Sequence, residues 1–188
     1  MGVKKGFTLI ETIVVLVVLS LTIPTIFAII FGIVRQQTKI YRLSKVKEEG
    51  DFILNTTATL IKNSALSIHS GNPPSDANEE CASSGESYSS TSRLFFKDQE
   101  GDWFRILLSS DKISSYSSST TTSVFLNSGK TIVSGLSIGC DRVADYSPPV
   151  VNLSFDICYV VSTGNCTSTR PEETASLHYQ TKIKLRNF

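Results

Sequence analysis

The amino-acid sequence predicts an α+β fold, in which one long N-terminal helix packs on a C-terminal antiparallel β-sheet. Residues 7–34 form an apolar stretch with a single charged side chain, Glu11. The rest of the 188-residue chain is polar and rich in Ser and Thr, and its second half holds short alternating stretches between turn residues. Strands that follow one helix are typical of α+β folds. We therefore expect the helix to lie in a membrane over its first half and the sheet domain to lie in water.

The apolar stretch at residues 7–34 is long enough to cross a bilayer, because about 20 apolar residues suffice for a spanning helix. A cleaved secretory signal has a shorter apolar core followed by a small-residue cleavage site. This stretch is too long for such a core, and no such site follows it. Residues 1–6 are instead a short basic leader that carries Lys4 and Lys5.

Glu11 is the unusual residue of this segment, because a charge at the centre of a spanning helix costs about 2.5–3.5 kcal/mol and less near the interface. A cut after Gly6 would give Phe7 a free amino group. That amine would be a partner for Glu11, four residues along the same helix or on a neighbouring subunit, and pairing offsets part of the desolvation cost. Taken alone, Glu11 fits an acid at the interface of an ordinary membrane anchor equally well.

The string around Glu11 resembles the class III signal of type IV prepilins and type II secretion pseudopilins. Eight consecutive positions match its pattern: Lys4, Lys5, Gly6, Phe7, Thr8, Leu9, Ile10 and Glu11. The resemblance implies a type IV pilin fold, cleavage between Gly6 and Phe7 by prepilin peptidase, and N-methylation of Phe7. It also implies that Glu11 pairs with the N-terminal amine of an adjacent subunit. The implied partners are other pilin or pseudopilin subunits, the inner-membrane assembly platform, and the lipid bilayer before assembly.

The helix is expected to continue over residues 35–70 as an amphipathic segment that ends near His69. Pro24 should kink or locally melt the membrane half, because proline removes a backbone hydrogen bond, and Gly50 is a second candidate bend. An apolar stripe at near-heptad spacing should pack on the sheet; its members are Ile40, Leu43, Val46, Ile53 and Leu60, flanked by Leu54, Ile61 and Ile68. The acidic group Glu48, Glu49 and Asp51 is expected to form a solvated face.

The orientation of the chain rests on two opposing signals. Five cations follow the apolar stretch, and naive charge counting would place the C-terminal body in the cytoplasm; they are Arg35, Lys39, Arg42, Lys45 and Lys47. The leader motif and the cysteines favour the opposite side. We expect a single-pass protein of the cytoplasmic membrane with its body outside the cytoplasm, and later an extracellular or periplasmic filament.

The globular part, residues 71–188, is expected to form five or six strands after a polar loop that contains Cys81. Apolar or alternating runs mark 93–97, 103–108, 123–126, 130–138, 150–161 and 176–185. Hairpin turns are expected at 98–101 and at 127–129. Along the last strand, one face is predicted to carry Leu177, Tyr179, Thr181, Ile183 and Leu185.

The last two strands show a second resemblance, to J-type minor pseudopilins and PilW-like minor pilins. The matching positions are Pro149, Val150, Val151, Leu153, Phe155 and Ile157, then Thr181, Ile183, Leu185, Arg186 and Asn187. This resemblance implies a minor subunit, found at the tip or at initiation of a filament, and not the bulk pilin.

The four cysteines, Cys81, Cys140, Cys158 and Cys166, all follow the apolar stretch. An even count in an exported domain indicates two disulfides, with three possible connectivities. A bridge between Cys158 and Cys166 across a hairpin loop would leave Cys81 with Cys140. The alternative is buried free thiols in a reducing compartment.

No motif in the chain indicates catalysis or a bound cofactor. There is no phosphate-binding glycine loop, no metal-ligand cluster and no nucleophile motif, and a formal net charge of +1 gives no strong field for nucleic acid. We expect a structural subunit that is not an enzyme, without cofactor, metal or direct nucleic-acid site. It would serve a type IV pilus, a DNA-uptake (competence) filament or a type II secretion filament. The alternative is a single-span receptor or adhesin that never polymerises.

Overall fold

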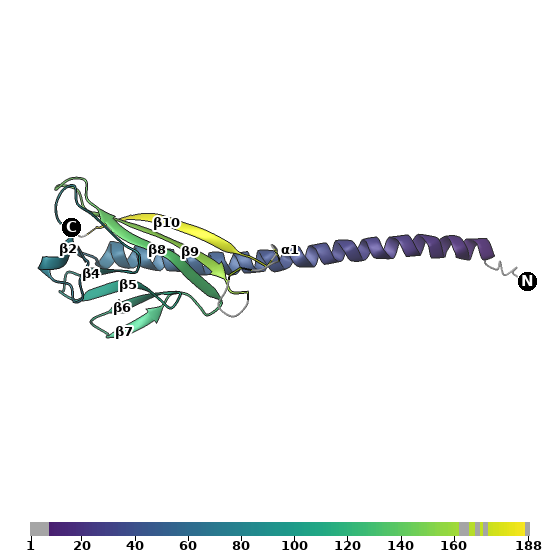
Figure 1. Cartoon of the computed structure of the whole chain (residues 1–188), viewed down its shortest axis with the longest axis horizontal. Coiled ribbons are helices and arrows are strands. Elements are labelled where there is room, and N and C mark those ends of the chain that lie inside the picture. The colour runs from purple at the N-terminus through teal and green to yellow at the C-terminus, as the bar shows by residue number, and fades with distance from the viewer. Residues whose placement is uncertain (1–7, 162–165, 168–169, 171–172, 187–188) are drawn as a thin grey trace, which may run out of the picture.

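The computed structural model describes residues 8–161, 166–167, 170 and 173–186 of the chain. One helix, α1 (Leu9–Ser64), runs the length of the molecule. Its first half projects alone from the body, and its second half lies along the β-strands (Figure 1). Within the described residues, α1 is the one helix that is long and apolar enough to cross a membrane. The predicted α+β architecture is confirmed.

The two ends of α1 have clear local causes. Thr8 is the N-cap, and Thr8 and Glu11 form a capping box that satisfies backbone N–H groups of the first turn. At the other end the helix stops at Ser64, earlier than the expected end near His69. The backbone N–H of Leu66 donates to the carbonyl of Lys97 at 2.8 Å. This contact draws the chain into the sheet, so that Ser67–His69 form strand β1 instead of a last helical turn.

α1 is uninterrupted at both expected bends, and a bend at Gly50 stays a prediction. α1 continues through Pro24 without interruption, so the predicted local melting is wrong for this structure, whereas a bend at Pro24 stays a prediction. The helix also continues through Gly50, which serves close packing: a Cβ placed there would run into the ring of Tyr179 on the last strand.

The strands form two antiparallel sheets, where the sequence predicted one. The larger sheet has the order β2-β1-β4-β5-β6-β7 and the smaller one β10-β9-β8-β3. The larger sheet contains β1, β2 (Glu79–Glu80), β4 (Arg93–Lys97), β5 (Trp103–Ser109), β6 (Lys112–Ser117) and β7 (Thr122–Phe125). The smaller contains β3 (Ser87–Ser90), β8 (Thr131–Asp141), β9 (Val150–Tyr159) and β10 (Ser176–Lys184). A short 3-10 helix, η1 (Asp76–Asn78), precedes β2.

The turn after β7 is where the single-sheet prediction fails. The hairpin predicted at 98–101 is confirmed, because β4 pairs with β5. The hairpin predicted at 127–129 is wrong, since β7 pairs with β6 and β8 pairs with β9. The buried side chain of Asn127 accepts from the N–H of Ile113 at 3.0 Å and donates to the carbonyl of Thr131 at 3.1 Å. These bonds fix the chain as it crosses from one sheet to the other.

The hydrophobic core lies between the second half of α1 and the two sheets. The buried helix positions recur every three or four residues and make one stripe; they are Val46, Gly50, Ile53, Thr57 and Ile61. α1 packs directly on β10 and β9. The rings of Phe96 and Phe104 stack at 5.1 Å in the same core cluster. Two expected stripe members, Ile40 and Leu43, are exposed, so the packed stripe begins at Val46.

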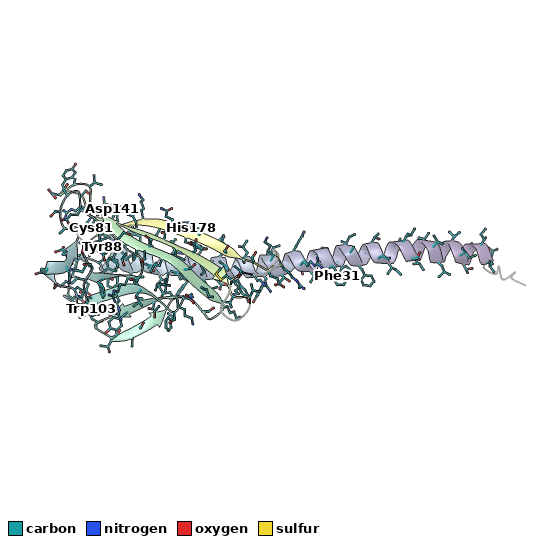
Figure 2. The ribbon with its side chains drawn as sticks, in the orientation of Figure 1. Phe31, Cys81, Tyr88, Trp103, Asp141 and His178 are labelled. Atoms are coloured by element: carbon teal, nitrogen blue, oxygen red, sulfur yellow. A yellow bond between two sulfur atoms is a disulfide. The ribbon has the colours of Figure 1, made fainter. Side chains whose placement is uncertain are left out.

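Two disulfides brace the smaller sheet, with the pairing that the sequence favours. Cys81 is joined to Cys140 with a Cα–Cα distance of 6.3 Å, and Cys158 to Cys166 with 5.8 Å. The first links the loop before β3 to the end of β8 (Figure 2). The second links the end of β9 to the segment that follows it.

Candidate functional site

The first half of α1 is an apolar surface that no other part of the described chain covers. The large apolar side chains from Leu9 to Val34 are each 46–79 % exposed. They surround the helix, and Phe31 lies on the part of α1 that extends beyond the body (Figure 2). Since burial of one such side chain contributes about 1.5–3 kcal/mol, this surface needs a lipid environment or the helices of other subunits.

The polar side chains within this half are satisfied by the helix itself. Hydroxyls of Thr12, Ser20 and Thr25 donate to the carbonyls of Leu9, Val17 and Thr22 at 2.8, 2.8 and 2.7 Å. In hydrocarbon an unsatisfied polar group costs several kcal/mol. The internal bonds remove that cost, which leaves the carboxylate of Glu11 as the one charged group of this half.

Glu11 lies in the first turn of α1, where the positive end of the helix dipole favours an anion. Its Oε2 accepts from the backbone N–H of Thr8 at 3.3 Å and from the Thr8 hydroxyl at 3.4 Å. Both bonds are long for their type. A charged donor such as an amine would bind the carboxylate more strongly, so Glu11 is held in place without being saturated. Gly6 and Phe7 lie outside the described residues, and the predicted cut, methylation and amine pairing there stay predictions.

Beyond the membrane half, α1 is fixed to the sheets by Glu49, which the sequence placed on a solvated face. That prediction is wrong for Glu49. Its carboxylate accepts from the Ser128 N–H at 3.0 Å, from the Ser128 hydroxyl at 2.5 Å, and from the hydroxyl of Thr131. Partial burial by itself would raise the pKa of Glu49, but these hydrogen bonds favour the charged form and leave the pKa below its usual value. Glu48, in contrast, pairs with Lys45 at 2.6 Å on the exposed side.

We call the contact of Glu49 with the sheets a joint. A second joint between α1 and the sheets forms where Gly50 contacts Tyr179. The Tyr179 ring stacks on Phe155 at 5.3 Å, and its hydroxyl donates to the carbonyl of Lys47 at 3.1 Å. Burial of the phenol and the nearby Asp51 carboxylate raise the pKa of Tyr179 to about 12. The phenol therefore stays protonated and keeps its hydrogen bond at any physiological pH.

A third joint lies closest to the membrane half. A guanidinium nitrogen of Arg42 donates to the carbonyl of Glu173 at 2.7 Å, and the group lies 5.6 Å from the centre of the Tyr159 ring. Arg42, Glu49 and Gly50 thus hold the body on one side of α1. A pull on the helix would be transmitted to the body through these contacts.

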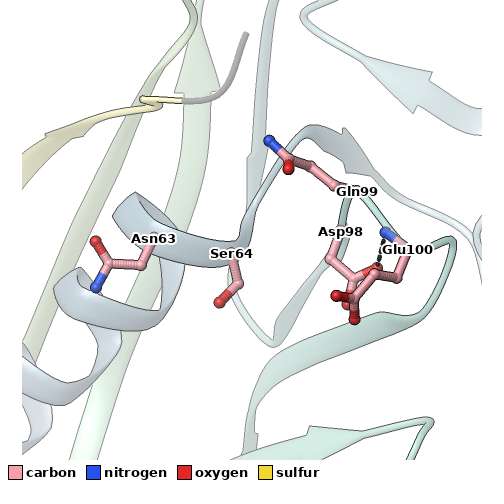
Figure 3. A pocket seen from close by; sticks show the side chains of 5 residues that line it. All are labelled: Asn63, Ser64, Asp98, Gln99 and Glu100. Atoms are coloured by element: carbon pink, nitrogen blue, oxygen red, sulfur yellow. Dashed lines mark hydrogen bonds between the residues drawn. The ribbon is translucent and has the colours of Figure 1, made fainter.

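One pocket lies at the far end of α1. It is lined by Asn63 and Ser64 of the helix end and by Asp98, Gln99 and Glu100 of the β4–β5 turn (Figure 3). Asp98 accepts from the backbone N–H of Glu100 at 3.0 Å, which is a bond that closes the turn. Among the described residues, no group of three or more His, Cys, Asp or Glu side chains is placed to hold a metal ion.

The sequence located the membrane half and Glu11 but not the three joints. In the sequence Arg42 and Glu49 stand out only as charges, because their partners lie far along the chain, at Glu173 and Ser128. One signal was available: a glycine inside a long helix, here Gly50, marks either a bend or a close approach.

Comparison with known proteins agrees with this geometry at the N-terminus. A family model described as the prokaryotic N-terminal methylation motif matches residues 1–23. No curated protein and no solved structure matches the chain. An apolar helix that begins with this motif and packs on antiparallel sheets supports a type IV prepilin-like protein. Its class III signal implies processing by prepilin peptidase and assembly with other pilins.

Proposed function

We propose that this chain is a minor pilin or pseudopilin, a structural subunit without enzymatic activity that enters a filament through the first half of α1. The observation that carries the proposal is the exposed apolar surface from Leu9 to Val34, which begins at a methylation motif and holds one unsaturated carboxylate. A lone membrane anchor needs the apolar surface, but it has no need for Glu11 beside a cleavage motif.

Assembly would proceed from the membrane. Cleavage after Gly6 exposes the amine of Phe7, which is methylated but still carries a positive charge. The amine of one subunit pairs with Glu11 of a neighbour. As the helices pack, both charges move from the membrane–water interface into the filament. The apolar side chains exchange lipid for other helices, so their burial costs little, and the charge pair sets the register.

The assignment as a minor subunit is supported by the strands that resemble those of minor pseudopilins. Seven of those residues fall on β9 and β10, the two strands that pack directly on α1, and Asn187 lies outside the described residues. They include buried Val151, Leu153, Phe155 and Ile183. The filament is a type IV pilus, a DNA-uptake filament or a type II secretion filament, and co-purified subunits would distinguish these three.

Filament incorporation tests the proposal. Filaments sheared from cells should contain the processed chain at a low ratio to the bulk subunit. A single-span adhesin that does not polymerise would stay entirely in the membrane fraction and keep its leader. Recovery of the chain only in that fraction, under conditions where the bulk pilin is sheared off, would contradict the proposal.

A further inference from the structure

A charged pocket lies immediately beyond the apolar half of α1. It is lined by Arg35 and Thr38 of the helix and by Arg170 and Glu173 of the segment between β9 and β10. Arg35 makes no hydrogen bond or ion pair with any residue that the structure describes. A guanidinium nitrogen of Arg170 lies 3.6 Å from the Glu173 carboxylate, and Arg42 donates a hydrogen bond to the backbone carbonyl of Glu173. The pocket is therefore lined by two guanidinium groups and one carboxylate.

The level of this pocket relative to the membrane follows from the helix geometry. An α-helix rises about 1.5 Å per residue, and the hydrocarbon core of a bilayer is about 30 Å thick. If Glu11 lies at one interface, the core extends over roughly residues 12–31. Arg35 then lies about 6 Å past the hydrocarbon, within the headgroup layer. The pocket opens at the level of phospholipid phosphates.

We propose that this pocket binds the headgroup of a zwitterionic phospholipid with a primary ammonium, such as phosphatidylethanolamine, while the subunit waits in the membrane. Guanidinium groups bind phosphate oxygens with paired, charge-assisted hydrogen bonds. The Thr38 hydroxyl donates to the carbonyl of Val34 at 3.1 Å, so toward the pocket it offers an acceptor. Glu173 and Thr38 thus supply acceptors for the ammonium, and Arg35 and Arg170 supply donors for the phosphate.

The charge of the pocket favours this ligand over a carboxylate of a neighbouring subunit. A single carboxylate would be attracted by the two arginines but repelled by Glu173. The zwitterionic headgroup instead places its phosphate beside the arginines and its ammonium beside Glu173. The bound lipid would hold the body upright on the membrane surface, and extraction of the subunit into a filament would release it. The inference rests on membrane insertion of α1 and not on polymerisation, so a single reconstituted subunit is sufficient to test it.

Lipid titration of the full-length chain in detergent, followed by native mass spectrometry, tests the site. Phosphatidylethanolamine, phosphatidylglycerol and phosphatidylcholine are added separately to wild type, R35Q/R170Q and E173Q. K47Q is the matched control, because Lys47 is an exposed cation on the same helix outside the pocket. Circular dichroism establishes that each variant is folded.

We expect wild type and K47Q to retain phosphatidylethanolamine in preference to the other two lipids. R35Q/R170Q should lose about tenfold in affinity for it, equivalent to about 1.4 kcal/mol. E173Q should lose the preference for the ethanolamine headgroup over the glycerol headgroup. Equal retention by wild type and R35Q/R170Q would overturn the proposal. Binding of inorganic phosphate by wild type without any preference among the three lipids would also overturn it, since the site would then be one for free phosphate.

Discussion

The carboxylate of Glu49, in the middle of α1, accepts two hydrogen bonds from Ser128, in the turn that joins the two sheets. These residues are far apart in sequence, and Thr131 adds a third bond from the start of β8. The chain crosses between sheets at this point, so the contact fixes the position of both sheets on the helix.

Replacement of Glu49 by Gln should lower the free energy of unfolding by about 1–2 kcal/mol at pH 7, because it removes charge-assisted bonds at a partly exposed site. The pKa of Glu49 is lowered in the folded state. Its stabilisation is therefore complete above the unfolded pKa and is lost as pH falls through the folded value. Urea unfolding followed by Trp103, the only tryptophan, should show the difference between wild type and E49Q shrinking as the pH falls below the unfolded pKa. E48Q is the control, and an equal loss in E48Q would contradict the role of Glu49.

Gly50→Ala should destabilise the body, because the added methyl group meets the Tyr179 ring. Overpacking of this kind costs about 1–3 kcal/mol. The matched control is Gly32→Ala in the same helix, where a Cβ meets nothing within 4 Å; it should be neutral or stabilising by about 0.5–1 kcal/mol. The two variants are compared by urea unfolding in one detergent. If G50A proves as stable as G32A, close packing is not the reason for this glycine.

The two disulfides should differ in their contribution to stability. They close loops with sequence separations of 59 and 8 residues. Loop-closure entropy predicts about 4 kcal/mol for the bridge between Cys81 and Cys140, and about 2.5 kcal/mol for the bridge between Cys158 and Cys166. Paired Cys→Ser variants, unfolded in urea, measure both values. A larger loss from the shorter loop would show that local contacts, and not chain entropy, dominate.

Glu11→Ala should leave the precursor inserted and processed, since the bond to be cut, between Gly6 and Phe7, is unchanged. The variant should be incorporated into filaments poorly, because the neighbouring amine would enter the apolar core unpaired, and leaving such a charge unpaired costs about 3–5 kcal/mol. Quantitative immunoblots of sheared filaments and membranes measure the two outcomes separately. Wild-type incorporation of E11A would remove Glu11 from the assembly mechanism.

Local patterns predicted the parts of the fold that depend on local chemistry. The membrane half follows from the apolar run, and β9 and β10 follow from alternation that places Val151, Leu153 and Ile183 inward. Strand β6 was missed because its sequence, KISSYS, is mostly polar and only Ile113 and Ser114 are buried. The sequence does not predict the division into two sheets, because that division depends on Asn127. In the sequence Asn127 resembles an ordinary turn residue, and only the structure shows the hydrogen bonds of its buried amide.

The residues of the candidate site also fall into those that local sequence patterns predict and those that depend on distant partners. Glu11 was found because a lone acid in an apolar run stands out in one dimension. Glu49 and Arg42 were not found, because each lies among several other charges and its partner is far along the chain. For Gly50 the sequence indicated a bend, and only the position of Tyr179 shows the close packing at this residue.

The N-terminal mass of the mature protein tests the central claim most directly. Intact mass and N-terminal peptide analysis of membrane-extracted wild type should give a chain that begins at methylated Phe7. Gly6→Leu should keep residues 1–6, since the peptidase requires a small residue before the cut. An intact Met1 in the wild type, in cells whose other prepilins are processed, would contradict the account and favour an ordinary membrane anchor.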